Sequence, residues 1–110
     1  MAFRVDITEL ALADIASYVS FLRDEKKEPE AAERWFRGLL MAIYSLEETP
    51  ERFLTIPESR FFRGQIVRHQ IYHSHRIVYE VDTKSKVVTV HRVYHGARRR
   101  LSHQSLFRNE

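Results

Sequence analysis

The sequence contains no cysteine, and this absence excludes disulfide bonds and thiolate metal sites. Its apolar runs all fall short of the roughly 20 residues that a membrane-spanning helix needs. The N-terminal stretch carries carboxylates at Asp6, Glu9 and Asp14, which is not the pattern of a signal peptide. We therefore expect a soluble, cytoplasmic protein that has no membrane partner.

Glycine is also scarce, with only three residues in the chain, so few positions are predicted to need a positive φ. The sequence has no internal repeat and no low-complexity segment. Its hydrophobic content of 44% is ordinary for a globular protein. We predict a single domain over residues 1–110, ending in a short polar tail from about residue 101.

Carboxylates are unevenly distributed and become rare in the second half. Residues 60–110 hold three Asp and Glu against 11 Lys and Arg, a net charge of +8, whereas residues 1–59 hold 12 against 7, a net charge of −5. Cations neutralise phosphates and imidazoles transfer protons, so this composition favours a polyphosphate ligand such as nucleic acid. The second half also holds all six histidines: His69, His73, His75, His91, His95 and His103.

The first half alternates between a short strand pattern and two helical patterns. Phe3, Val5 and Ile7 alternate with polar residues, which predicts a strand. Thr8 is a suitable N-cap for a helix that runs to about Lys27. The apolar stripe of this helix is predicted to contain Leu12, Ile15, Val19 and Leu22.

A second helix is predicted from Pro29, a residue that suits the first helical position, to about Glu48. The polar turn between the helices is short, so they should form an antiparallel hairpin. Pro50 ends the second helix. We expect its aromatic residues to lie in the core, and its buried face to contain Ala32, Trp35, Phe36, Leu39, Leu40, Ile43 and Leu46.

The remaining chain predicts strands over Ile66–Tyr72, Arg76–Asp82 and Lys86–Tyr94. We therefore predict an α+β fold with an N-terminal strand, an antiparallel two-helix hairpin, and a three-stranded antiparallel segment that completes one sheet. The hairpin should cover one face of the sheet, leaving the other face free as a working surface.

Five stretches carry a family resemblance: Leu12–Val19, Pro29–Leu46, Pro57-Glu58, His75–Val81 and Val90–Arg98. Together with the element order over residues 3–100, they resemble the RelE/ParE superfamily, the toxins of type II toxin–antitoxin systems. The resemblance implies a partner protein, a cognate antitoxin whose disordered segment wraps the toxin and folds as it binds.

Two activities follow from this resemblance. RelE-like members cleave mRNA on the ribosome without a metal, whereas ParE-like members poison DNA gyrase. The His-Arg-Ile-Val-Tyr strand looks like the nuclease branch. The leading interpretation is therefore a metal-independent, cofactor-free mRNA endonuclease that acts with the ribosome and blocks translation. The alternative is a DNA gyrase poison without catalytic activity of its own.

RNA cleavage by transesterification needs a base for the 2′-OH proton, cations for the phosphorane charge and an acid for the departing oxygen. The resemblance assigns Arg76 to the scissile phosphate, His95 to the leaving group and Tyr94 to stacking or proton donation. Each residue also has a structural interpretation: an ion pair of Arg76 with Glu80, a surface imidazole at His95 and a core aromatic at Tyr94.

The neighbouring strand offers Arg68 as a second phosphate contact, or His69 as a base or nucleic-acid contact. Because side chains alternate along a strand, Arg68 and His69 cannot both face one groove, and we favour Arg68. Arg98 and Arg99 are predicted to bind nucleic acid, with a solvated tail as the alternative.

The histidines do not predict a metal site. His91 and His95 would chelate a metal on a helix, but on a strand they lie about 13 Å apart. His73 and His75 flank a turn without a nearby carboxylate or thiolate to complete a site. We therefore predict that the protein binds no metal.

Overall fold

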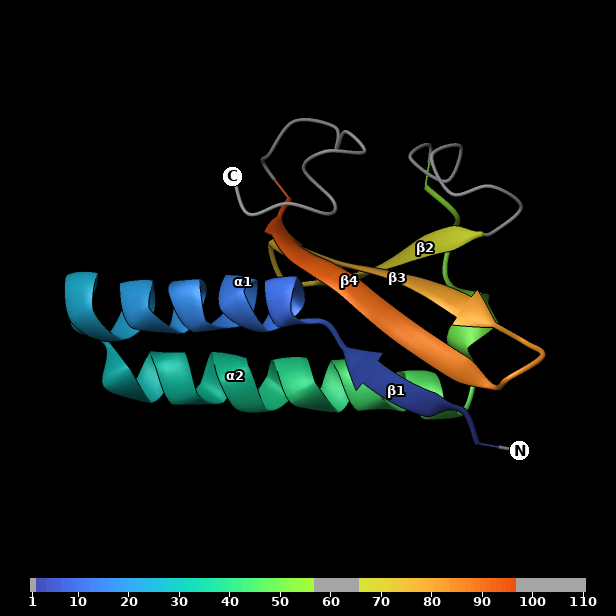
Figure 1. The fold of residues 1–110 in the computed structure, drawn as a ribbon. Helices are drawn as coiled ribbons and strands as arrows, with labels where there is room; N and C mark the ends of the chain where they lie inside the picture. Colours follow the sequence, from blue (N-terminus) through green and yellow to red (C-terminus); the bar gives the residue numbers. More distant parts are fainter. Residues whose placement is uncertain (1, 57–65, 97–110) are drawn as a thin grey trace.

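The computed structural model describes residues 2–56 and 66–96. Its sheet has the strand order β1-β4-β3-β2, in which β1 runs parallel to β4 and the other neighbours are antiparallel. Figure 1 shows the two long helices side by side and running in opposite directions next to this sheet. The predicted α+β fold is confirmed. The main elements are β1 (Arg4–Ile7), α1 (Glu9–Ser20), α2 (Pro29–Tyr44), β2 (Val67–Tyr72), β3 (His75–Asp82) and β4 (Val87–His95).

The first helix begins as predicted and ends earlier. The Thr8 hydroxyl accepts a hydrogen bond from the Ala11 amide at 3.1 Å, which caps α1. After Ser20 the chain continues as a π-helical turn, η1 (Phe21–Glu25), in which the Lys26 amide donates to the Phe21 carbonyl. The prediction of one regular helix to Lys27 is therefore wrong in its last turn.

The second helix also ends before the predicted residue, because Ser45–Glu47 forms a short 3-10 turn, η2. Pro50–Arg52 forms another, η3. The main core lies between the helices and one face of the sheet. Its fully buried side chains include Leu39, Ile43, Leu46, Ile77, Tyr79, Val88 and Val90.

Two residues predicted for this core lie at the surface instead. Leu12 is 52% exposed and Phe36 is 40% exposed. Ala11 and Ile15 fill the buried side of α1, since its first turns lie along the edge of β4. On α2 the buried aromatic is Trp35, and the next residue along the helix, Phe36, turns outward.

The sequence predicts that the second face of the sheet is free. The structure shows that this face is partly covered. A smaller apolar cluster of Ile56, Val67, Val78 and Tyr94 is buried there. Its members are drawn from β2, β3, β4 and the segment that pairs with β2 through Thr55 and Arg68. The free part of this face is thus limited to positions around the cluster.

Close packing between α2 and β2 depends on Gly38. The Tyr72 hydroxyl donates to the Trp35 carbonyl at 2.9 Å, which brings its ring against the helix. A Cβ atom on Gly38 would overlap that hydroxyl. The missing side chain therefore allows this contact.

Candidate functional site

The register of β2 and β3 decides which predicted residues share a face. His69 lies opposite Val78 and Arg68 opposite Tyr79, a core residue. The Arg76 Nε donates to His69 Nδ1 at 3.2 Å, whereas Arg68 donates to the Phe53 carbonyl at 2.7 Å. The preference for Arg68 as the neighbour of Arg76 is therefore wrong, and His69 takes that place.

The last two residues of β4, Tyr94 and His95, were both predicted to take part in the site, but they lie on opposite faces of the sheet. Tyr94 lies opposite Arg76, whereas His95 lies opposite His75, and the His75 and His95 rings are 5.2 Å apart. Consecutive side chains on a strand point to opposite faces. Arg76, His69 and Tyr94 thus lie on one face of the sheet, and Arg68 and His95 lie on the other.

Tyr94 is a core residue on its face. It is 4% exposed, and the Arg92 guanidinium carbon lies 4.4 Å from the centre of its ring. A nucleobase would need an exposed ring face to stack on. The geometry agrees with the structural interpretation of Tyr94.

Arg92 forms an ion pair with Asp14, a contact that the sequence did not predict. Asp14 accepts from Arg92 Nε and a terminal nitrogen, both at 2.7 Å, and from the Val93 amide at 2.9 Å. The Asp14 carboxylate raises the pKa of Arg92. This contact fixes α1 to β4 beyond Val90, where β1 ends. No local sequence pattern links residues so far apart.

A second polar pair on this face joins Glu80 to His91 at 2.5 Å, and both side chains are largely buried. His91 is an extra residue in β4, because Tyr79 pairs with Val90 and Val78 with Arg92. Such a bulge redirects a side chain, and strand alternation alone does not reveal it. Glu80 thus pairs with His91, whereas the structural interpretation of Arg76 placed Glu80 beside Arg76.

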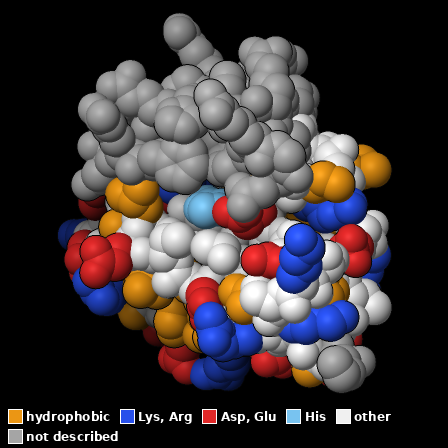
Figure 2. All heavy atoms as spheres, turned by 45° about the vertical axis from the view of Figure 1, so that its right-hand side comes forward, with side chains coloured by type: hydrophobic (Ala, Val, Ile, Leu, Met, Phe, Trp, Pro, Cys, Tyr) orange, Lys and Arg blue, Asp and Glu red, His pale blue; other side chains and the backbone are white. Residues whose placement is uncertain are grey.

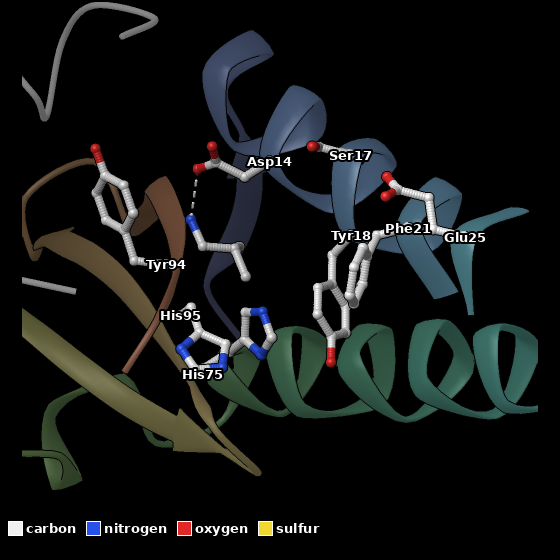
Figure 3. Close-up of a pocket in the computed structure, with 9 residues that line it drawn as sticks. Asp14, Ser17, Tyr18, Phe21, Glu25, His75, Tyr94 and His95 are labelled. Atoms are coloured by element: carbon white, nitrogen blue, oxygen red, sulfur yellow. Dashed lines mark hydrogen bonds between the residues drawn. The ribbon is translucent and has the colours of Figure 1, made fainter. Parts of the chain in front are cut away.

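A pocket of about 300 Å³ lies on the helical side of the sheet end (Figure 3). We call it the π-turn pocket because Phe21 and Glu25 of η1 line it. His75 lies against it with 3% exposure, and burial lowers the pKa of this imidazole to about 4. The other residues of the pocket are Asp14, Ser17, Tyr18, Val93, Tyr94 and His95.

The predicted nucleic-acid contacts Arg98 and Arg99, like the polar tail, lie outside the described residues. Figure 2 shows one face of the molecule, on which basic and acidic side chains are interspersed. Within residues 2–56 and 66–96, no three His, Asp or Glu side chains are grouped closely enough to hold a metal ion. In the same ranges, no helix has the length and apolar character to cross a membrane.

Comparison with known protein families identifies the family to which the chain belongs. Residues 5–100 match the family described as ParE toxin of the type II toxin–antitoxin system parDE. The chain belongs to the ParE toxin family. This membership confirms the predicted RelE/ParE relationship and makes the chain a toxin of a type II system. No curated protein gives a significant match.

Solved structures agree with the ParE fold. A chain of the chromosomal ParDE system from P. aeruginosa is similar with a TM-score of 0.67 and 14% identity, covering 86% of this chain and 96% of that one. A chain of the archaeal RelE–RelB complex from Pyrococcus horikoshii OT3 is similar with a TM-score of 0.60 and 20% identity, covering 90% of this chain and 100% of that one. A chain of the toxin–antitoxin complex RelBE2 from Mycobacterium tuberculosis is similar with a TM-score of 0.59 and 21% identity, covering 86% of this chain and 99% of that one.

Proposed function

We propose that this ParE family member arrests growth by trapping DNA gyrase on cleaved DNA, without breaking bonds itself. The observation that carries the proposal is the family match over residues 5–100. It favours the alternative that the sequence left open over the leading interpretation of mRNA cleavage.

The distribution of the predicted catalytic residues supports the same function. General acid and phosphate-binding groups must converge on one phosphodiester within hydrogen-bond reach. Here Arg76 and His95 lie on opposite faces of the sheet, and Arg68 donates to the backbone at Phe53. Tyr94 is buried under Arg92. A binding poison needs none of these groups to converge.

The test uses purified gyrase, supercoiled plasmid, ATP and the full-length toxin. Poisoning is expected to accumulate linear plasmid after detergent and protease treatment. Arg76→Ala is expected to retain this activity and to arrest growth, since no catalytic role rests on it. Absence of linear plasmid at toxin concentrations in excess over gyrase would reject the proposal.

One observation favours mRNA cleavage as a second candidate. Arg76 and His69 are hydrogen-bonded on the face away from the helices, and both are only partly buried. An arginine beside an imidazole could neutralise a phosphate and move a proton without a metal. Primer extension after induction would then show discrete cuts within translated frames. These cuts would disappear in Arg76→Ala and weaken in Arg76→Lys, which keeps the charge.

We also propose a cognate antitoxin that masks exposed apolar side chains of the helical hairpin. Leu12, Phe36, Met41 and Tyr44 are exposed on α1 and α2. An amphipathic segment that folds on binding would cover such side chains. Replacing Phe36 and Met41 with serine is expected to weaken neutralisation by the antitoxin encoded beside the toxin gene, measured as growth during co-expression.

A further inference from the structure

The π-turn pocket contains a buried polar atom without a partner. His75 is 3% exposed, and its Nδ1 has no hydrogen-bond partner among the described residues. Its ring contacts are with Tyr18 at 4.3 Å, Trp35 at 5.0 Å and His95 at 5.2 Å. An unsatisfied buried nitrogen costs free energy, so the pocket is incomplete as it stands.

The wall opposite His75 contains an uncommon backbone element. The turn Phe21–Glu25 is π-helical, with the Lys26 amide bonded to the Phe21 carbonyl at 3.0 Å. Single π turns are rare and frequently occur at functional sites. In Figure 3 the Tyr18 and Phe21 rings lie side by side, and the Tyr18 ring is next to the His75 ring, whose centre is 4.3 Å away.

The polar groups of the pocket are mainly hydrogen-bond acceptors. Glu25 lines it with an exposed carboxylate, and Ser17 adds a hydroxyl. The low pKa of His75 keeps the imidazole neutral at pH 7, so one of its nitrogens is an acceptor. The charge of Asp14 is compensated by Arg92. Among the described residues that line the pocket, none is lysine or arginine.

The aromatic walls favour a cation as well. The Tyr18 and Phe21 ring centres are 5.8 Å apart and the planes are inclined by 32°. Aromatic faces attract ammonium and guanidinium groups, and the Lys26 ammonium already lies 5.9 Å from the Phe21 ring centre. A phosphodiester would instead meet the Glu25 carboxylate, so this pocket differs in ligand preference from a phosphate site.

We propose that the π-turn pocket binds an arginine side chain of a partner protein. The guanidinium pairs with Glu25, stacks on Tyr18 or Phe21 and donates to Ser17. A volume of about 300 Å³ accommodates one long side chain rather than a folded segment. This inference stands whether the toxin acts on gyrase or on mRNA.

The test is an NMR titration of the full-length protein with Nα-acetyl-L-arginine methylamide. Saturable shifts are expected at Ser17, Phe21 and His95. The citrulline analogue has the same shape without the charge, and we expect it to bind at least about tenfold more weakly. Glu25→Gln should weaken arginine binding by about tenfold. The matched variant Asp24→Asn, whose side chain faces Arg23, should leave it unchanged.

Three results would overturn the proposal. Equal affinity for the arginine and citrulline probes would show that charge does not matter. Shifts confined to residues outside the pocket would place binding elsewhere. Tighter binding of guanosine monophosphate than of the arginine probe, with shifts at Phe21 and His95, would reassign the pocket to a nucleotide.

Discussion

At the scale of single residues, the pKa of His75 depends strongly on its surroundings. It lies among the rings of Tyr18, Trp35 and His95, where a charged imidazole would lose its hydration. This burial lowers its pKa from 6.5 to about 4. The unfolded chain therefore takes up a proton at a higher pH than the folded protein does.

This difference predicts how stability depends on pH. Between pH 6.5 and 4 the unfolded state binds more protons, so the free energy of unfolding should fall as the pH falls, by about 3 kcal/mol in total. Above about pH 8 His75 is neutral in both states and contributes no slope. Urea unfolding at a series of pH values measures the effect.

His75→Phe keeps a ring in the core and should remove this part of the slope. The exposed His73→Gln serves as the control and should retain it. Equal slopes in the wild type and in His75→Phe would contradict the assignment.

Alternation along a strand explains how far the site was predictable. It showed correctly that Arg68 and His69 lie on opposite faces, but the choice between them required the register with β3. That register is set by the turn that pairs Tyr72 with His75. Long-range contacts such as Asp14 with Arg92 leave no periodic signal in the sequence, so the structure was needed to find them.

At the scale of elements, the contact between α2 and β2 depends on the space above Gly38. A Cβ there would overlap the Tyr72 hydroxyl, which is held by the Trp35 carbonyl. Gly38→Ala gains helix propensity but should still lower the free energy of unfolding by about 1–3 kcal/mol, because the ring must move.

A double-mutant cycle tests this cause. Tyr72→Phe removes the overlapping hydroxyl, so Gly38→Ala should cost clearly less in that background. Thermal and urea unfolding of the four proteins gives the coupling energy. Equal costs of Gly38→Ala in both backgrounds would show that the hydroxyl is not responsible.

Element types were predictable because their patterns are local. The alternation of apolar residues placed the three later strands within a residue or so of their observed bounds, and Thr8 marked the start of α1. The π turn after Ser20 was not predictable, because its apolar spacing also fits a regular helix. Phe36 was misassigned because adjacent apolar residues on a helix cannot all face the same core.

At the scale of the whole molecule, the two halves of the sequence are not two halves of the structure. The acidic first half contributes β1, which joins the sheet beside β4 from the basic second half. The face in Figure 2 accordingly mixes both signs of charge.

The strand order also predicts the pattern of amide hydrogen exchange. β3 is paired on both sides, and so is β4 over Val87–Val90, whereas β1 and β2 are the outer strands of the sheet. Amides of β3 and of Val87–Val90 should exchange only through global unfolding, and those of β1 should exchange at least about tenfold faster through local opening. Native-state exchange followed by NMR measures both. Equal protection in β1 and β3 would reject a separately opening first strand.

The parallel contact of β1 with β4 fixes an order of assembly. Arg4 pairs with Val87 and Ile7 with Val90, so the first strand to be synthesised must wait for the last one. A product of interrupted translation that stops before residue 87 lacks the strand that pairs with β1, the Arg92 side chain that pairs with Asp14, and the His95 ring that lies beside His75. Such a fragment cannot complete the fold, and we expect it to be degraded by proteases rather than to be toxic.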